Sequence, residues 1–382
     1  MFFGGLKLHP WKGRFGVSRA RLRLIVLAAA AFVSACATRP GGLLEPVAPV
    51  AQATSISVLT ISTRAPSSRP GFVYSGERGD QTTLAAVEVS IPPGHRVGRI
   101  ETPRGGGSPD PTEHFAASEI RTLDEPGADQ WIETHATDGR VLVYVHGYNI
   151  PFDYAVFRVA QIAVDSGLTA APVLFTWPSR GHTFAYLYDR ESTNFSRDAL
   201  ERTLRIACRN PQVRELNVLA HSMGAWLTIE ALRQYAIRDG AVCPKIQNVV
   251  LASPDLDIDV FLRQFEALGP DRPYFTFLIS QRDFALRISR ILSGGIQRLG
   301  ATNPEAEPFK SKLESTGGVA LIDLSSFARQ GTLNHSKYAS TPEVTKRLGE
   351  LFFQSRGREL PDAYPAALPQ SQSEAEPPPT PK

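Results

Sequence analysis

The chain has 382 residues and 42% of them are hydrophobic, which is enough to build one large domain or two small ones. The formal net charge is +3, but the first 35 residues hold six basic residues and no acidic one. The remainder has 35 basic and 38 acidic residues, so the basic balance belongs to the N-terminal segment. No basic patch of the kind that binds nucleic acid is present in the sequence, and we expect no nucleic-acid partner.

The N-terminal segment predicts export. Three arginines at positions 19, 21 and 23 precede an apolar run at 24–33, which ends in Val33-Ser34-Ala35-Cys36. A basic start, a short apolar stretch and small residues are typical of a signal peptide, and the stretch 24–35 is too short to span a bilayer. The last four residues resemble the lipobox of bacterial lipoproteins, in which the cysteine is lipidated. The alternative is an ordinary signal peptide with a chance cysteine.

The lipobox resemblance implies that residues 1–35 are removed and that Cys36 holds the protein on a membrane through acyl chains. Ala37, directly after the cysteine, resembles the lipoproteins that Gram-negative bacteria sort to the outer membrane. We therefore expect a lipid-anchored protein of the cell envelope, on the outer membrane and facing the periplasm.

The segments on either side of the main domain look like linkers. Residues 36–54 are rich in Ala, Pro and Gly, and the Pro-rich tail 356–382 is expected to be disordered. Between them, 55–355 is expected to form one domain. Its first part, 55–140, is rich in predicted strands, with β-like runs at 56–62 and 84–91 separated by turn residues.

From position 141 to 355 predicted strands alternate with predicted helices, which indicates an α/β fold with a mostly parallel sheet and helices on both faces. Strands of such a sheet are buried on both faces, which explains their continuous apolar runs. The expected strands are 141–145, 173–177, 216–220, 249–252, 274–280 and 319–323. The expected helices include 152–165, 197–208, 226–238 and 260–267.

The most specific local pattern predicts a sharp strand-to-helix turn with Ser222 at its tip. Such a nucleophile elbow is tight, so the residues two before and two after the serine must be small; here they are Ala220 and Gly224. The serine then lies at a helix N-terminus. There the backbone amide of Met223 is oriented to stabilise an oxyanion.

The other reactive side chains follow neighbouring strands. The carboxyl ends of parallel strands meet at one edge of the sheet, and ligands bind there. Ser222, Asp283 and His335 each follow a predicted strand, in the chain order serine, acid, histidine. This is the chain order of the catalytic residues in α/β-hydrolases, and it differs from their order in two unrelated folds of serine proteases.

Several motifs in the same order strengthen this interpretation. The segment from about Ser55 to Phe353 resembles a bacterial α/β-hydrolase family of largely uncharacterised function. The members of this family resemble serine hydrolases of the esterase and lipase type. The resemblance implies the α/β-hydrolase fold and a hydrolase-type site, but it supplies no substrate. The matching pieces are TISTR at 60–64, VSIPP at 89–93, VYVHGYN at 143–149, TWPS at 176–179, YDRES at 188–192, the elbow, and ASPD at 252–255.

Serine needs an adjacent base to act as a nucleophile, and His335 is the candidate because it lies in the loop after the last strand. His146 and His221 are nearer in sequence to strand ends. We expect them to pack and to form hydrogen bonds within their own turns.

The base needs an acid to hold its tautomer. Asp283 is the preferred candidate, because it follows the penultimate strand. Asp255 and Asp257 follow the strand before it and are the alternative acids, although either Asp257 or Asp259 is also suited to cap the next helix. For the oxyanion hole, an amide from Gly147 or Tyr148 is expected to act with that of Met223.

The sequence indicates no cofactor. It has no phosphate loop, no dinucleotide-binding glycine pattern and no paired metal-ligand spacing. If Cys36 is lipidated, the remaining Cys208 and Cys243 precede neighbouring strands, where either a disulfide or two separate thiols is possible.

The sequence as a whole predicts a serine hydrolase that is anchored to the envelope and cleaves carboxylic or lipid esters through an acyl-enzyme. A small-molecule or lipid ester is thus the expected substrate. One alternative is an acyltransferase that uses the same triad. The other is a non-catalytic binding or scaffold lipoprotein, which would not need a complete set of nucleophile, base and acid.

Overall fold

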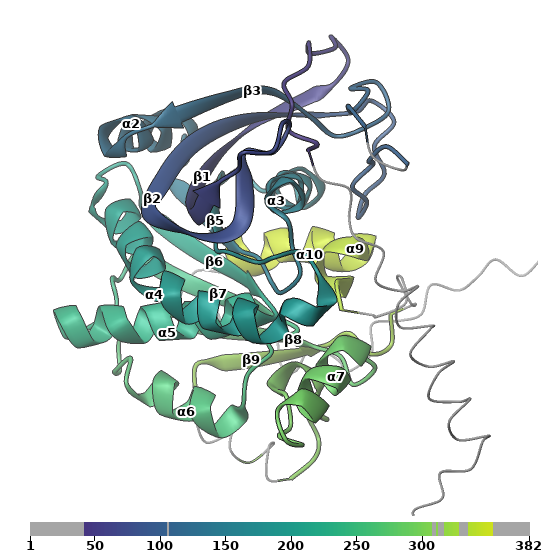
Figure 1. The fold of residues 1–382 in the computed structure, drawn as a ribbon. Coiled ribbons are helices and arrows are strands. Elements are labelled where there is room, and N and C mark those ends of the chain that lie inside the picture. Colours follow the sequence, from purple (N-terminus) through teal and green to yellow (C-terminus); the bar gives the residue numbers. More distant parts are fainter. Residues whose placement is uncertain (1–41, 105–106, 308–310, 312–316, 328–334, 354–382) are drawn as a thin grey trace, which may run out of the picture. The chain divides into compact units, whose positions relative to one another are not determined.

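The computed structural model describes residues 42–104, 107–307, 311, 317–327 and 335–353 (Figure 1). By itself, Arg39–Lys382 forms one compact unit. The expected signal peptide, Cys36 and the Pro-rich tail lie outside the described residues, so these expectations stay predictions. Within the described part, no helix combines the length and the apolar character needed to cross a membrane.

The described chain is organised around one sheet with the strand order β3-β2-β1-β5-β4-β6-β7-β8-β9. The pairs β1–β2 and β2–β3 are antiparallel and every other pair is parallel. The strands are β1 (Thr54–Pro66), β2 (Tyr74–Ile91), β3 (Ala116–Leu123), β4 (Arg140–Val145), β5 (Ala171–Thr176), β6 (Glu215–His221), β7 (Ile246–Ala252), β8 (Tyr274–Ile279) and β9 (Val319–Asp323).

Helices cover both faces of this sheet (Figure 1). One face packs against α2 (Glu125–His135), α4 (Tyr186–Arg209), α5 (Met223–Asp239) and α6 (Ile258–Glu266). The other face packs against α3 (Phe152–Asp165), α9 (Lys337–Ser340) and α10 (Pro342–Phe353). The shorter elements are η1 (Thr183–Ala185), α7 (Phe284–Leu292) and η2 (Leu299–Ala301).

Successive residues of the central strands enter different cores. Val143 and Val218 belong to the cluster on the α4–α5 face, whereas Leu142 and Leu219 belong to the cluster on the α3–α10 face. Because both sides of each strand are buried, the strands read as continuous apolar runs. The expected α/β architecture, a mostly parallel sheet with helices on both faces, is confirmed.

Several elements differ from expectation: β2 begins at Tyr74 rather than at Leu84, and α2 lies in the part that was expected to be rich in strands. Helix α4 begins at Tyr186 rather than at Arg197, because its first turns bury polar residues that hide the apolar periodicity. β3 was not expected: it is an edge strand whose outward positions are polar and whose inward positions include small alanines. The helix Phe152–Asp165 has the expected bounds, and Asp257 caps α6 by accepting hydrogen bonds from the next helical amides.

A buried ion cluster ties the β2–β3 connection to α3. His95 Nδ1 lies 2.8 Å from Glu101 Oε2, and His95 Nε2 lies 2.8 Å from Asp165 Oδ1. Burial lowers the pKa of His95, but the hydrogen bonds to Asp165 and Glu101 outweigh it and leave the pKa raised. The folded protein therefore favours the imidazolium form of His95 more strongly than the unfolded chain does.

A disulfide joins Cys208 to Cys243, with a Cα–Cα distance of 6.5 Å. Cys208 lies near the end of α4 and Cys243 lies just before β7, so the bond crosses between the segments that enter the neighbouring strands β6 and β7. Of the two possibilities that the sequence left open, the structure has the disulfide.

Candidate active site

Ser222 occupies a strained turn between β6 and α5. Its backbone has φ 54° and ψ −120°, a left-handed conformation that is costly for a serine. Surrounding backbone bonds fix the turn: the Ser222 amide donates to Ala252 O at 3.0 Å, and Ser222 O accepts from the amide of Asp255 at 3.2 Å. The side chain therefore lies at the tip of an elbow, directly before the first helical residue, Met223.

Two glycines allow the elbow to approach the loop after β4. A Cβ on Gly224 would lie 2.5 Å from His146 O and 2.6 Å from Val145 O, so only glycine fits there. A Cβ on Gly147 would lie 2.9 Å from the Cβ of Ser222. The loop that was expected to supply an oxyanion donor is thus packed directly against the candidate nucleophile.

The candidate base and acid are hydrogen-bonded to each other. His335 Nδ1 lies 2.7 Å from Oδ2 of Asp283, which is fully buried. A carboxylate only accepts hydrogen bonds, so Nδ1 bears the proton and Nε2 is the basic nitrogen of the neutral ring. The other carboxylate oxygen, Oδ1, accepts from the Leu286 amide at 3.1 Å and caps α7, which fixes the acid in place.

The backbone around His335 is anchored to the elbow and to the end of β9. His221 Nε2 donates to His335 O at 2.9 Å, and the two rings lie 4.6 Å apart. Lys337 Nζ donates to Leu324 O at 2.9 Å, and Tyr338 OH shares a 2.8 Å hydrogen bond with the hydroxyl of a tyrosine on β4. His221 thus connects Ser222's turn to the histidine loop, a contact of longer range than the bonding within its own turn that was expected.

The backbone amide of Asp255 bonds to the elbow at Ser222 O, but its carboxylate is bonded elsewhere. Its Oδ1 accepts from Ser289 Oγ at 2.6 Å and lies 3.2 Å from Arg298 Nε, and its Oδ2 accepts from Tyr186 OH at 3.2 Å. This cluster joins the start of α4 to α7 and η2. Of the three candidate acids, Asp283 is the one with a hydrogen bond to His335, whereas Asp257 caps α6.

The loop His146–Ile150, which contains Gly147 and Tyr148, is supported by a buried arginine. Arg64, at the end of β1, donates to Ile150 O at 2.8 Å and to Ser179 O at 2.9 Å, and its Nη2 lies 3.2 Å from His146 Nε2. Its Nε also donates to Thr176 Oγ1 at 2.8 Å. The guanidinium thus joins β1, the loop after β4 and the loop after β5.

His146 completes this network from within the loop. Its Nε2 accepts from the Trp177 amide at 3.2 Å, so its Nδ1 bears the proton and donates to Gly147 O at 2.8 Å. The ring stacks on the Trp177 indole with a centroid distance of 4.9 Å. His146 therefore acts within its own turn, as expected, and also holds β5 against it.

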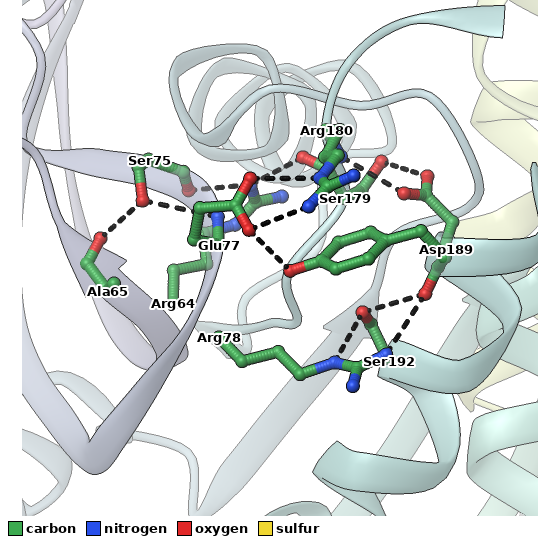
Figure 2. Close-up of polar contacts among 10 residues, drawn as sticks. Arg64, Ala65, Ser75, Glu77, Arg78, Ser179, Arg180, Asp189 and Ser192 are labelled. Carbon is green, nitrogen blue, oxygen red and sulfur yellow. Dashed lines mark hydrogen bonds and ion pairs between the residues drawn. The ribbon is translucent and has the colours of Figure 1, made fainter. Parts of the chain in front are cut away.

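Asp189, in the first turn of α4, bonds to Ser179 and Arg180 in the loop after β5 (Figure 2) and also holds the far side of the loop His146–Ile150. It accepts from Ser179 Oγ at 2.5 Å, from the Arg180 amide at 3.0 Å and from the Asn149 amide at 3.3 Å. Tyr148, inside the loop, donates through its hydroxyl to Thr183 O at 2.5 Å. The loop is therefore held from β1, β5 and α4.

Burial perturbs the charges of this network in opposite directions. It lowers the pKa of Arg64 to about 10, so the guanidinium stays charged at neutral pH. It raises the pKa of Asp189, although hydrogen bonds from Ser179 and from backbone amides oppose the shift. Both groups are buried and lie close enough for the carboxylate to favour the charged guanidinium.

Sequence reasoning assigned no role to Arg64, Thr176, Ser179 or Asp189. They occur, however, in the separate motif pieces that carry the family resemblance. The only signal in the sequence was that these pieces occur together, because nothing in their spacing indicates that they meet. Within the described ranges, no group of His, Cys, Asp and Glu side chains is arranged to hold a metal ion.

Comparison with protein families agrees with this architecture. A family model described as an alpha/beta hydrolase of unknown function (DUF900) matches residues 124–351. No curated protein matches the chain. Among solved structures, a predicted CIB-like hydrolase from Thermoplasma acidophilum is 12% identical with a TM-score of 0.34, over 70% of this chain and 90% of its own. An esterase from Pyrococcus furiosus is 10% identical with a TM-score of 0.36, over 81% of this chain and 97% of its own. A Pyrobaculum calidifontis esterase is 12% identical with a TM-score of 0.34, over 89% of this chain and 94% of its own.

Proposed function

Because the chain belongs to the α/β-hydrolase family of unknown function DUF900, we propose that it is a serine hydrolase of carboxylic esters. Ser222 is the nucleophile, His335 the general base and Asp283 the acid that orients it. The observation that carries the proposal is the 2.7 Å hydrogen bond between His335 and Asp283. A hydrogen bond from His221 to the backbone of His335 connects this pair to the strained turn of Ser222.

The proposed reaction follows the acyl-enzyme route. Ser222 Oγ attacks the ester carbonyl while His335 Nε2 takes its proton, and the resulting imidazolium is stabilised by Asp283. The amide of Met223, with that of Gly147 or Tyr148, donates to the developing oxyanion. His335 then protonates the leaving alcohol, and a water molecule that it activates releases the acid product and restores the serine.

Active-site labelling tests this proposal directly. A fluorophosphonate probe phosphonylates a serine only where a base activates it, so we expect the full-length protein to be labelled and Ser222→Ala not to be. A folded wild-type protein that resists labelling and hydrolyses no ester would disprove the serine hydrolase.

The choice of acid is tested by a matched pair of variants. Asp283→Asn should lower kcat for p-nitrophenyl acetate by about 10⁴-fold, since an amide favours the wrong histidine tautomer. Asp255→Asn should retain most of the activity, because that carboxylate bonds to Ser289, Tyr186 and Arg298 instead. The reverse result would assign the role to Asp255.

We further propose that the enzyme acts in the cell envelope and is anchored through Cys36. The signal-peptide pattern that ends in Val33-Ser34-Ala35-Cys36 supports this, as does the Cys208–Cys243 disulfide, because structural disulfides persist mainly in oxidising compartments. Cys36→Ser should release the protein from the membrane fraction after export. An unchanged membrane fraction would contradict the lipid anchor at this residue.

A further inference from the structure

Helix α7 exposes three of its large apolar side chains, whereas Leu286 and Ser289 are its buried residues. Ile291 and Leu292 are 76% and 60% exposed, and Phe284 at the start of the helix is 40% exposed. The face turned to the protein contains Leu286 and Ser289, of which only Leu286 is large and apolar. A helix that packed in the ordinary way would bury the larger apolar side chains.

A second exposed apolar segment lies beside α7. Phe184 in η1 and Leu187 at the start of α4 are 91% and 76% exposed. They lie on either side of Tyr186, whose hydroxyl is 2.9 Å from Ser289 Oγ on α7. We call the six exposed residues of these two segments the apolar rim. They are Phe184, Leu187, Phe284, Ile291, Leu292 and Ile296.

The α7 part of the rim is interleaved with positive charge. Arg282, Arg287 and Arg290 are exposed, and the sole acidic residue between 282 and 298 is Asp283, which is fully buried and hydrogen-bonded to His335. Exposed apolar side chains alternating with arginines match a surface that is both apolar and anionic. Anionic phospholipid bilayers have these two properties at their interface.

We propose that the apolar rim binds the surface of an anionic phospholipid bilayer and that the substrate is a lipid ester taken from it. The position of the rim supports this, because α7 begins directly after Asp283, the residue that contacts His335. An ester drawn from a bilayer at α7 would enter the molecule beside the proposed base. The substrate part of this inference rests on the proposed esterase function, whereas the binding part does not.

Vesicle flotation tests the binding part without catalysis. The probe is a set of vesicles of phosphatidylcholine, either alone or mixed with an equal amount of phosphatidylglycerol. The protein is the chain from residue 37 onward, which contains the whole compact unit Arg39–Lys382 and no acyl anchor, with Ser222→Ala present so that no lipid is consumed. We expect it to float with the anionic vesicles and to bind neutral vesicles far more weakly.

Two double variants and one control test which residues bind the vesicles. Ile291→Ser with Leu292→Ser should weaken binding about tenfold or more, since two inserted apolar side chains are lost. The control Ile237→Ser removes an apolar residue on α5 that is 56% exposed and lies outside the rim, and it should change nothing. The variant Arg287→Gln with Arg290→Gln should weaken binding to anionic vesicles about fivefold per arginine.

The same variants, with Ser222 restored, separate binding from chemistry. Ile291→Ser with Leu292→Ser should hydrolyse water-soluble p-nitrophenyl acetate like the wild type but cleave a vesicle-borne phospholipid ester at least about tenfold more slowly. The proposal is overturned if the wild type does not float with anionic vesicles, or if the apolar double variant floats equally well. It is also overturned if sedimentation shows that the rim instead forms a dimer that this variant dissociates. Rim-dependent flotation without activity on any ester would support the binding and disprove the esterase function alone.

Discussion

Removal of the Arg64 side-chain donors should loosen the loop that faces Ser222. In Arg64→Met, the carbonyls of Ile150 and Ser179 lose donors at 2.8 and 2.9 Å in a buried site. Each buried acceptor left without a partner costs about 1–3 kcal/mol. Methionine fills the apolar part of the space and removes the cost of burying a charge, so we expect the free energy of unfolding to fall by about 2–4 kcal/mol.

The same change should reduce catalysis in molecules that remain folded. The loop His146–Ile150 contains the proposed oxyanion donors, and a displacement of about 1 Å at such a position can lower kcat about 10²-fold. Urea unfolding followed by circular dichroism gives the stability change, and turnover of p-nitrophenyl acetate under native conditions gives kcat. Arg121→Met, an exposed arginine on β3, is the matched control and should shift stability by no more than about 0.5 kcal/mol.

Arg64→Lys separates charge from geometry. Lysine keeps the positive charge but lacks the planar set of donors that reaches Ile150, Ser179 and Thr176 at once, so most of both losses should remain. If lysine restores wild-type stability and kcat, charge alone is sufficient and the hydrogen-bond argument is wrong. It is equally wrong if Arg64→Met changes stability by less than about 1 kcal/mol and leaves kcat unchanged.

Three further predictions concern other parts of the fold. The pKa of His95 is raised in the folded state, so the stabilisation that the charged ring gains from Asp165 should be complete below about pH 6.5 and should be lost as the pH rises through the folded pKa. Urea unfolding at about pH 6 and about pH 9 should therefore show that His95→Gln lowers the free energy of unfolding more at the lower pH. Cys243→Ser opens a loop with a sequence separation of 35 and should lower the free energy of unfolding by about 3–4 kcal/mol, as dithiothreitol should in the wild type but not in the variant. Gly147→Ala places a Cβ 2.9 Å from that of the nucleophile and should lower ester turnover about 10²-fold, whereas Gly94→Ala, with open space around it, should not.

The parts of the fold that depend on short-range pattern were predictable from sequence. The helix Phe152–Asp165 has the expected bounds, because its apolar residues recur with helical spacing. The turn at Ser222 was predictable because a strand, small flanking residues and a helix follow one another without interruption. The disulfide was not, since spacing alone cannot decide whether Cys208 and Cys243 point toward each other.

The supports of the candidate site depend on long-range contacts. Ser222, Asp283 and His335 could be selected because each follows a strand of the predicted sheet. Arg64 could not, because it meets Thr176 only through the parallel pairing of β1 with β5, which joins segments 112 residues apart in the sequence. Strand order of this kind is decided by tertiary packing, not by the local pattern of either strand.

The misjudged start of α4 has the same physical origin as the support of the loop. Its first turns bury Asp189, Ser192 and Ser196, which make the segment look like a polar connection. Asp189 accepts from the Asn149 amide, and Ser196 Oγ shares a 2.8 Å hydrogen bond with Thr63 Oγ1 beside the buried arginine of β1. Apolar residues at these positions would give a regular amphipathic helix but would remove the hydrogen bonds to the Asn149 amide and to Thr63 Oγ1. The departure from the helical pattern therefore occurs where α4 supports the loop of the candidate site, and departures from a local pattern are expected at such positions.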